Sequence, residues 1–370
     1  MGKASGIEDH KIGVKSQRSV VEIPTHGLGG WGLVDGFRVF GLRWGWGLFM
    51  MQPTALGEPR VITRHKRSHN RATASFVGRR EIVDSFGKET FEVKSKYEGK
   101  SAIVTGGSSG IGRSLALQLV QMGCDVAIVA RRPALLDEAR VAMEGVRQRP
   151  EQKILARAMD ISQQSDVEAG VSALTGELGR VDLLFNNAGV AHCDYFENTE
   201  PAVFEKMMQI NYFGTVWMTR AVLPQMRARN AGHLVNVTSI LGVMSIVGYT
   251  AYAASKFAIH GFSDALRNEL ADTAIQMSLV MPPDTDTPQY AEENKTKPPE
   301  TKAIAGSAKL MSADDVARLT LKGVAAGRYH ILPGKMDLKM IHLAATTTPN
   351  MMRFFVDRDV RNFRKKKRLS

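Results

Sequence analysis

A glycine-rich turn between an apolar strand and an apolar helix constrains the fold of this chain more than any other feature. SAIVT (101–105) is typical of a short buried strand, and TGGSSGIG (105–112) follows it and opens a helix. Its glycines allow a tight turn and a close backbone approach, and the free N–H groups of the helix start suit a pyrophosphate. We therefore predict a dinucleotide-binding turn. Its expected contacts are Gly106, Ser108, Ser109, Gly110, Ile111 and Gly112.

Strand-like and helix-like segments alternate along the rest of the body. Helical patterns of ten or more residues separate the apolar runs, including a long one at 200–229 and another near 313–326. The predicted strands are 101–105, 125–130, 153–160, 181–188, 233–239, 274–282 and 329–333. This order predicts an α/β fold, a Rossmann-type doubly wound parallel sheet of about seven strands with helices on both faces.

Three zones follow from the same pattern. Residues 1–99 lack sustained periodicity and are predicted to be a poorly structured N-terminal extension. Residues 100–333 form the predicted single domain, and 334–370 an apolar, Met-rich segment with a basic tail. The Gly/Trp-rich piece at 27–51 is not a clean membrane span, because charged residues interrupt a window that needs about 18–20 apolar residues. No signal-peptide pattern opens the chain.

The net charge of +12 lies at the two ends of the chain. Residues 1–99 hold 16 Lys/Arg and 10 Asp/Glu, residues 353–370 hold 8 and 2, and the middle has 25 of each. A neutral body argues against nucleic acid as a partner, and a basic tail beside apolar residues favours an anionic membrane surface. Two cysteines give neither a disulfide framework nor metal-ligand spacing, so we expect a reducing compartment and no metal.

The end of the second predicted strand indicates which dinucleotide binds. Chains that prefer NAD usually carry an acid there, which holds the ribose 2′-hydroxyl. This chain has Ala130 followed by Arg131 and Arg132. Two guanidinium groups there would bind the 2′-phosphate of NADP. The alternative is that both arginines are solvated side chains of a surface loop. We predict NADPH as the cofactor.

A tyrosine and a lysine four residues apart provide a reacting group. Tyr252 and Lys256 fall one turn apart at a predicted helix start, on one face. An ammonium beside a phenol lowers the pKa of the phenol toward neutrality, and the phenol can then exchange a proton with a substrate oxygen. Ser239, at the end of the fifth predicted strand, could hydrogen-bond the same oxygen or merely cap the strand.

Over about residues 100–333 the chain resembles the short-chain dehydrogenase/reductase family. TGGSSGIG is similar to its cofactor turn, NNAG (186–189) to its mid-sheet motif, and Ser239, Tyr252 and Lys256 to its catalytic trio. The resemblance implies that Tyr252 donates the proton in reduction, that Lys256 also holds the nicotinamide ribose, and that Ser239 orients the carbonyl. It further implies that Asn211 supports a proton relay, that Asp160 contacts adenine and that Asn186 lies beside the adenosine ribose.

The stretch MPPDTDTPQYAEENKTKPPETK (281–302) follows the sixth predicted strand, where this family closes its substrate site. It resembles the members of the family that reduce the C3 ketone of 3-dehydrosphinganine, a long-chain sphingoid ketone. The substrate carries an amino group beside the ketone, so Asp284 or Asp286 could pair with its ammonium. The alternative is that these aspartates cap turns in a proline-rich loop.

The resemblance also implies a location and leaves alternatives open. Eukaryotic members with this lid act at the endoplasmic reticulum membrane, on its cytosolic face, and usually begin with a spanning helix that this N-terminus lacks. A homo-oligomer is possible. The alternatives are a reductase of a retinoid, steroid or fatty acyl ketone, and a cofactor-binding membrane protein without turnover, against which the intact Tyr252 and Lys256 argue.

Overall fold

The structure is a computed structural model that describes residues 92–305, 310–334 and 336–369. All of them belong to one compact unit, His69–Ser370. The predictions made for the segment before residue 92 lie outside the described residues.

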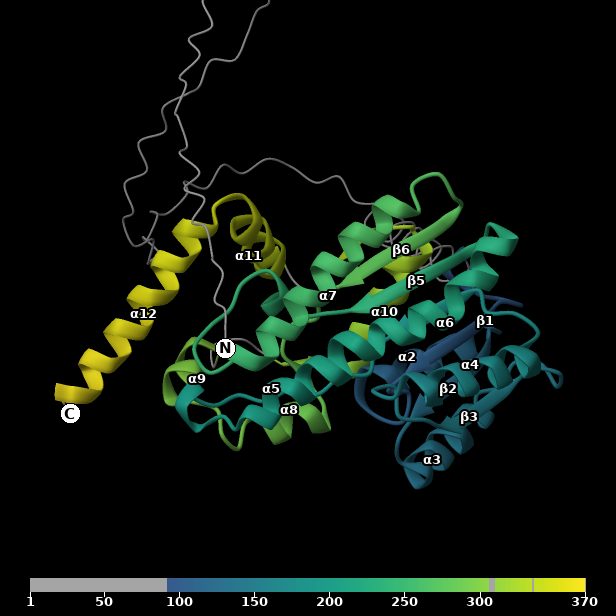
Figure 1. The fold of residues 1–370 in the computed structure, drawn as a ribbon, viewed down its shortest axis with the longest axis horizontal. Helices are drawn as coiled ribbons and strands as arrows, with labels where there is room; N and C mark the ends of the chain where they lie inside the picture. The colour runs from purple at the N-terminus through teal and green to yellow at the C-terminus, as the bar shows by residue number, and fades with distance from the viewer. Residues whose placement is uncertain (1–91, 306–309, 335, 370) are drawn as a thin grey trace, which may run out of the picture. The chain divides into compact units, whose positions relative to one another are not determined.

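A parallel sheet of seven strands forms the centre of this unit (Figure 1). Its spatial order is β3-β2-β1-β4-β5-β6-β9, with every neighbouring pair parallel. The strands are β1 (Ser101–Thr105), β2 (Asp125–Ala130), β3 (Ile154–Ala158), β4 (Leu183–Asn186), β5 (Gly232–Val237), β6 (Ile275–Val280) and β9 (His330–Ile331). The order reverses direction between β1 and β4, which is the crevice where such sheets bind ligands. The predicted doubly wound fold is confirmed.

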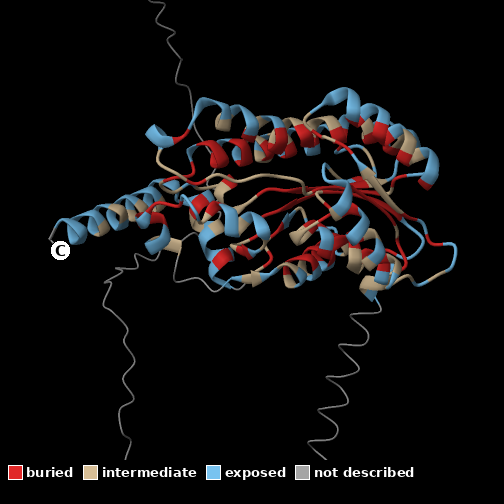
Figure 2. Cartoon of the chain, turned by 90° about the horizontal axis from the view of Figure 1, so that it is seen from below, coloured by how far each residue is buried: buried red, intermediate tan, exposed pale blue. Residues whose placement is uncertain are grey.

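Helices cover both faces of the sheet (Figure 2). Successive residues of a strand point to opposite faces and therefore into opposite layers. Val104 packs with Leu115 and Leu321 on one face, whereas Ile103 packs with Val167 on the other. The first layer contains α2 (Gly110–Gln121), α3 (Pro133–Glu144) and α10 (Ala313–Ala325). The second layer contains α4 (Gln164–Leu178), α6 (Gly214–Arg229) and α7 (Thr250–Glu269).

The long helix predicted over 200–229 contains a π-helical turn. The segment consists of α5 (Pro201–Met207), the π turn η2 (Met208–Phe213) and α6. Asn211 lies within the π turn and is fully buried. Single π turns inside helices occur often at functional sites, because they redirect one side chain and free a backbone group.

The lid and the C-terminal segment are more ordered than the sequence indicated. The lid contains β7 (Thr285–Asp286), α8 (Pro288–Glu293) and α9 (Pro299–Ala305), and β7 pairs with β8 (Met311–Ser312). After β9 come α11 (Met336–Thr347) and α12 (Pro349–Leu369). The sequence analysis predicted no helix in either region, because proline-rich and charge-rich stretches gave no clear apolar period.

The domain begins earlier than predicted. Residues 92–99, which we assigned to the N-terminal extension, pack on the core. Tyr97 is fully buried and its hydroxyl donates to the carbonyl of Leu321 over 2.6 Å. Val93 packs against the same core, and the N–H of Gly99 donates to the carbonyl of Gly123 over 3.1 Å. No periodic pattern in the sequence marks this segment.

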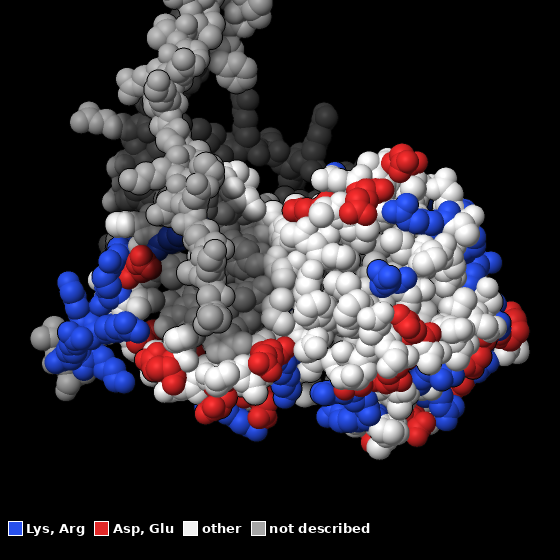
Figure 3. Space-filling model, viewed as in Figure 1, with Lys and Arg blue, Asp and Glu red and all other residues white. Residues whose placement is uncertain are grey.

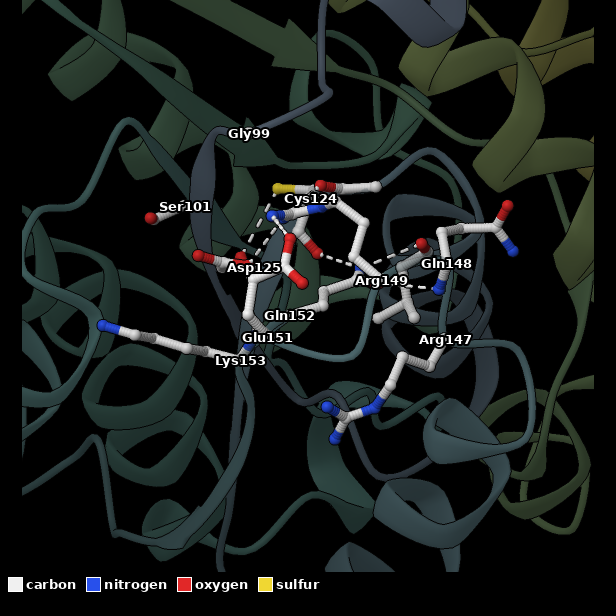
Figure 4. A network of polar contacts seen from close by, with 12 residues as sticks. Gly99, Ser101, Cys124, Asp125, Arg147, Gln148, Arg149, Glu151, Gln152 and Lys153 are labelled. Carbon is white, nitrogen blue, oxygen red and sulfur yellow. Dashed lines mark hydrogen bonds and ion pairs between the residues drawn. The ribbon is translucent and has the colours of Figure 1, made fainter.

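A polar network closes the sheet at the amino ends of β1 and β2, opposite the crevice (Figure 4). Arg149 donates to the carbonyl of Gly123 and to Oδ1 of Asp125 over 2.9 and 3.1 Å. Gln152 is 1% exposed, and its Nε2 donates to the carbonyls of Val120 and Cys124 over 3.0 and 2.6 Å. These contacts join the loop after α3 to the start of β2.

Substitution of Gln152→Ala is expected to lower the free energy of unfolding by about 1–3 kcal/mol, because it removes the donor from buried carbonyl oxygens. The urea midpoint measures this loss. The matched control is Gln148→Ala, since Gln148 is exposed and its amide bonds only at the surface. Equal midpoints for the two variants would contradict the role given to the network.

Candidate active site

A cavity of about 750 Å³ opens at the carboxyl ends of the strands. Its floor is the glycine-rich turn and the ends of β2 and β3, and its far wall includes Ser239, Tyr252 and Lys256. The lid segment from Pro282 to Glu293 lines the remaining side. The crevice therefore brings together the predicted cofactor turn, the predicted catalytic trio and the lid.

The glycine turn has a geometry that only glycine accommodates. Gly106 and Gly110 adopt φ values of +68° and +53°. A Cβ at Gly112 would lie 2.4 Å from the carbonyl oxygen of Gly106, so α2 can approach the turn this closely only without a side chain there. Gly112 is not part of the cavity wall; the other predicted turn contacts, Gly106, Ser108, Ser109, Gly110 and Ile111, all line it.

The start of α2 can accept an anion. Its N-cap is Ser109, whose side chain makes no capping hydrogen bond, and its first turn carries no acid. The N–H groups at the helix start and the positive end of the helix dipole are thus directed at the cavity without a competing carboxylate. These residues fit a dinucleotide pyrophosphate.

Arg131 and Arg132 lie at the cavity edge, where β2 ends in Ala130. Both are exposed, and neither makes an ion pair with another described residue. Asp160 lines the cavity beyond the end of β3, and its Oδ1 accepts from the N–H and hydroxyl of Ser162 over 3.0 and 2.8 Å. These three side chains occupy the positions predicted for the adenosine end of a cofactor.

Asn186 does not face the cavity, and this corrects its prediction as a cofactor contact. Its side chain is 3% exposed and is bonded to α6 and β5: Nδ2 donates to Oγ1 of Thr219 and to Oδ1 of Asn236 over 3.0 and 2.9 Å. The next residue, Asn187, lines the cavity instead. Strand alternation explains the difference, since adjacent residues point to opposite sides.

Lys256 lines the cavity wall but is itself almost fully buried. It is 4% exposed, and its Nζ donates to the carbonyl of Val237 over 3.1 Å. Burial lowers the pKa of Lys256 to about 8. A Cβ at Gly189 would lie 3.4 Å from this Nζ and 3.2 Å from Oδ1 of Asn211, so the two groups lie on the same side of Gly189.

Tyr252 lies one turn before Lys256 on α7, with the Nζ of Lys256 5.7 Å from the ring centroid. Burial, and next the charge of Glu293, raise the pKa of Tyr252 above its ordinary value, and hydrogen bonding with Ser239 lowers it only in part. The prediction that Lys256 brings this pKa toward neutrality is wrong for the described chain. The lysine is itself desolvated and directed at a backbone carbonyl.

Asn211 acts on the backbone next to the cavity. Its Oδ1 accepts from the N–H of Val190 over 2.8 Å, and its Nδ2 donates to the carbonyl of Val190 and to Oγ of Ser255 over 3.0 and 2.9 Å. The side chain is not in the cavity wall. It holds the segment after β4 against α7; its part in a proton relay stays a prediction.

The two lid aspartates differ in position. Asp284 lines the cavity, and its carboxylate makes no hydrogen bond or ion pair within the part of the chain that the structure describes. Burial raises the pKa of Asp284, and the charge of Lys297 lowers it in part. Asp286 is exposed and lies outside the wall. Of the two, only Asp284 can reach a ligand.

Sequence reasoning missed a buried polar cluster in the lid. Glu293 accepts from the hydroxyl of Tyr249 over 2.9 Å and pairs with Lys297 over 3.1 Å, and the side chains of this pair are 9% and 2% exposed. The i,i+4 spacing of Glu293 and Lys297 was visible, but such pairs are usually solvated. Tyr249 packs against Tyr252 with ring centroids 5.8 Å apart, so the cluster contacts the reacting side chain.

Comparisons with known proteins agree with this site. Residues 100–298 match the short chain dehydrogenase family, which covers more than half of the chain. The chain belongs to the short-chain dehydrogenase family. This membership makes it an oxidoreductase and identifies its cofactor as a nicotinamide dinucleotide.

Relatives within the family have related names. The chain is 39% identical over 235 residues to the 3-dehydrosphinganine reductase of Danio rerio, covering 63% of this chain and 71% of that one. It is 39% identical over 252 residues to the 3-ketodihydrosphingosine reductase of Mus musculus, covering 68% and 76%. A short chain dehydrogenase/reductase from Burkholderia phymatum in complex with NAD has the same fold, with a TM-score of 0.61, 24% identity and coverage of 69% and 96%. The predicted resemblance of the chain to 3-dehydrosphinganine reductases is confirmed.

The lowered pKa of Lys256 predicts an alkaline limb in the pH profile. As the pH rises through about 8, the ammonium loses its proton and with it the charge that would hold the cofactor ribose. We expect kcat/KM for the nicotinamide cofactor to fall above about pH 8. Residual activity of Lys256→Arg should lack this limb, because a guanidinium keeps its proton. A flat wild-type profile up to pH 10 would contradict the assignment.

Proposed function

We propose that this chain reduces the C3 ketone of 3-dehydrosphinganine to sphinganine with NADPH. The single observation that carries the proposal is Asp284, a cavity carboxylate that has no ion-pair partner among the described residues. It occurs in a chain related to 3-dehydrosphinganine reductases. Asp284 is partly buried, and an unpaired carboxylate is costly to desolvate, so a substrate ammonium would offset that cost.

The charges of the lid support an amino ketone as substrate. Glu293 and Lys297 form a buried ion pair, so their charges compensate each other. Glu292, the other acid of the lid that lines the cavity, pairs with Lys295, so Asp284 leaves one uncompensated negative charge in this part of the wall. In 3-dehydrosphinganine the ammonium is on the carbon next to the carbonyl carbon. Asp284 lies near enough to Tyr252 that its negative charge contributes to the raised pKa of the phenol. The proposed ammonium site and the proposed proton donor are thus neighbours.

The environment of Tyr252 suits reduction rather than oxidation. Its raised pKa keeps the phenol protonated at neutral pH, which is the form that donates a proton to a carbonyl oxygen. Ser239 lies in the same cavity wall and can donate a second hydrogen bond to that oxygen. NADPH, when bound, supplies the hydride that the carbonyl carbon receives.

Arg131 and Arg132 support NADPH as the form of the cofactor. They are unpaired among the described residues and stand where β2 ends without an acid. A 2′-phosphate would receive charge-assisted hydrogen bonds there, whereas NADH would leave both guanidiniums solvated.

The C-terminal helices support action at a membrane surface. Among the described residues no helix is long and apolar enough to cross a membrane. Basic side chains gather where α12 ends (Figure 3). The exposed apolar side chains of α11 and α12 are Met336, Met340, Ile341, Leu343, Met351 and Phe354. We propose contact with the cytosolic face of the endoplasmic reticulum, where basic residues near an anionic leaflet each contribute about 1 kcal/mol.

Asp284→Asn is expected to raise KM for 3-dehydrosphinganine at least about tenfold, because a charge-assisted contact contributes about 1.5–3 kcal/mol. KM for the same ketone without its amino group should not change. Asp286→Asn, an exposed neighbour, is the matched control and should behave as wild type. Equal KM values for the amino ketone in wild type and Asp284→Asn would exclude this contact.

Arg131→Ala and Arg132→Ala together are expected to raise KM for NADPH about 100-fold or more, since each lost phosphate contact removes about 1.5 kcal/mol or more. KM for NADH should change little, because NADH carries no 2′-phosphate. Steady-state kinetics with both cofactors measure the difference. A parallel loss with NADH would assign the arginines a different role.

A further inference from the structure

A cluster of three histidines and an aspartate lies where α7, β9 and α11 meet. His260 and Asp264 stand four residues apart on α7, His330 is on β9, and His342 is on α11. Three possible ligand atoms lie within 4.8 Å of one another, one each from His260, Asp264 and His330. None of the four lines the active-site cavity. This cluster, called here the histidine cluster, has no part in the proposed reaction.

The ring separations match those of imidazoles on one metal ion. The centroids of His330 and His260 are 5.8 Å apart, and those of His330 and His342 are 5.1 Å apart. With zinc–nitrogen bonds of about 2.0–2.1 Å and tetrahedral angles, two coordinated imidazoles have centroids about 5 Å apart. The ligand atoms of such a site are about 3.3 Å apart. Those of His260, Asp264 and His330 lie within 4.8 Å of one another, so they must approach further to bind one ion.

Two ring nitrogens of the cluster lack any partner. Nδ1 of His260 and Nε2 of His342 are buried and make no hydrogen bond within the described residues. A buried ring nitrogen without a partner is costly unless something satisfies it.

Asp264 is oriented as a ligating carboxylate usually is. The hydroxyl of Tyr329 donates to its Oδ1 over 2.5 Å, which leaves Oδ2 facing Nε2 of His260 at 3.8 Å. Metal-bound carboxylates and histidines are commonly fixed by such outer hydrogen bonds. Asp264 is about half exposed, so an ion can reach the cluster from solvent.

We propose that His260, Asp264, His330 and His342 bind one Zn²⁺ ion as a structural site. Three nitrogen donors and one carboxylate favour zinc over the oxygen-seeking Mg²⁺ and Ca²⁺. The ion would join α11 to α7, the helix that carries Tyr252 and Lys256. This junction matters because only Leu338 and Ala345 of α11 are buried among its described residues.

Metal binding to the full-length chain tests the site. After treatment with a chelator and addition of one equivalent of Zn²⁺, desalted wild type should retain one ion per chain, and its Tm should rise by several degrees. His330→Ala should lose the ion, and Asp264→Asn should bind it at least about tenfold more weakly while keeping the acceptor for Tyr329. Asp272→Asn, an exposed acid beyond the end of α7, is the matched control and should bind as wild type.

Two results would overturn the proposal. The first is wild type that retains no zinc at micromolar concentration. The second is equal stoichiometry and equal Tm shifts for wild type, His330→Ala and Asp264→Asn, which would put the ion elsewhere in the chain. Co²⁺ in place of Zn²⁺ should give an absorption spectrum without a thiolate charge-transfer band; such a band would assign the metal to Cys124 or Cys193. Activity with ketones does not enter this test, so its outcome is separate from that of the proposed function.

Discussion

Lys256 is buried at the carboxyl edge of the sheet, and the carbonyl of Val237 holds its ammonium group. This contact fixes the start of α7 against the end of β5, and Tyr252 and Ser239 take their positions from those two elements. Asn211 secures the opposite side through Val190 and Ser255. The sheet and its helices thus position the reacting side chains through contacts that do not involve the lid.

The lid adds the charges that distinguish one ketone from another. Glu293 and Lys297 are buried as a pair and bonded to Tyr249, so they connect the lid to the helix that carries Tyr252. Such a pair is weak evidence for stability, because desolvation opposes the attraction of the charges. Its effect on the site is electrostatic. Burial raises the pKa of Tyr252 most, and the charges of Glu293 and Asp284 add to this rise, so the phenol stays a proton donor.

The sheet and the cofactor turn could be predicted because their signals are local. Apolar strands, glycines and the Tyr252–Lys256 spacing each follow from a few neighbouring residues. The remaining features depend on contacts between distant segments. Nothing near Glu293 shows that its pair with Lys297 is buried, and the histidine cluster joins residues up to 82 positions apart. The sequence does not distinguish Asn186 from Asn187 as the residue that faces the crevice. That depends on the residue at which β4 ends, which only the folded sheet determines.

The most direct test of the account is turnover by the purified chain with NADPH and three ketones or aldehydes: 3-dehydrosphinganine, retinal and a steroid ketone. The account predicts that 3-dehydrosphinganine is reduced to sphinganine with the highest kcat/KM, and that Tyr252→Phe abolishes this turnover while still binding the cofactor. Reduction of retinal or the steroid without reduction of 3-dehydrosphinganine would contradict the proposed substrate. Undiminished turnover by Tyr252→Phe would contradict the mechanism.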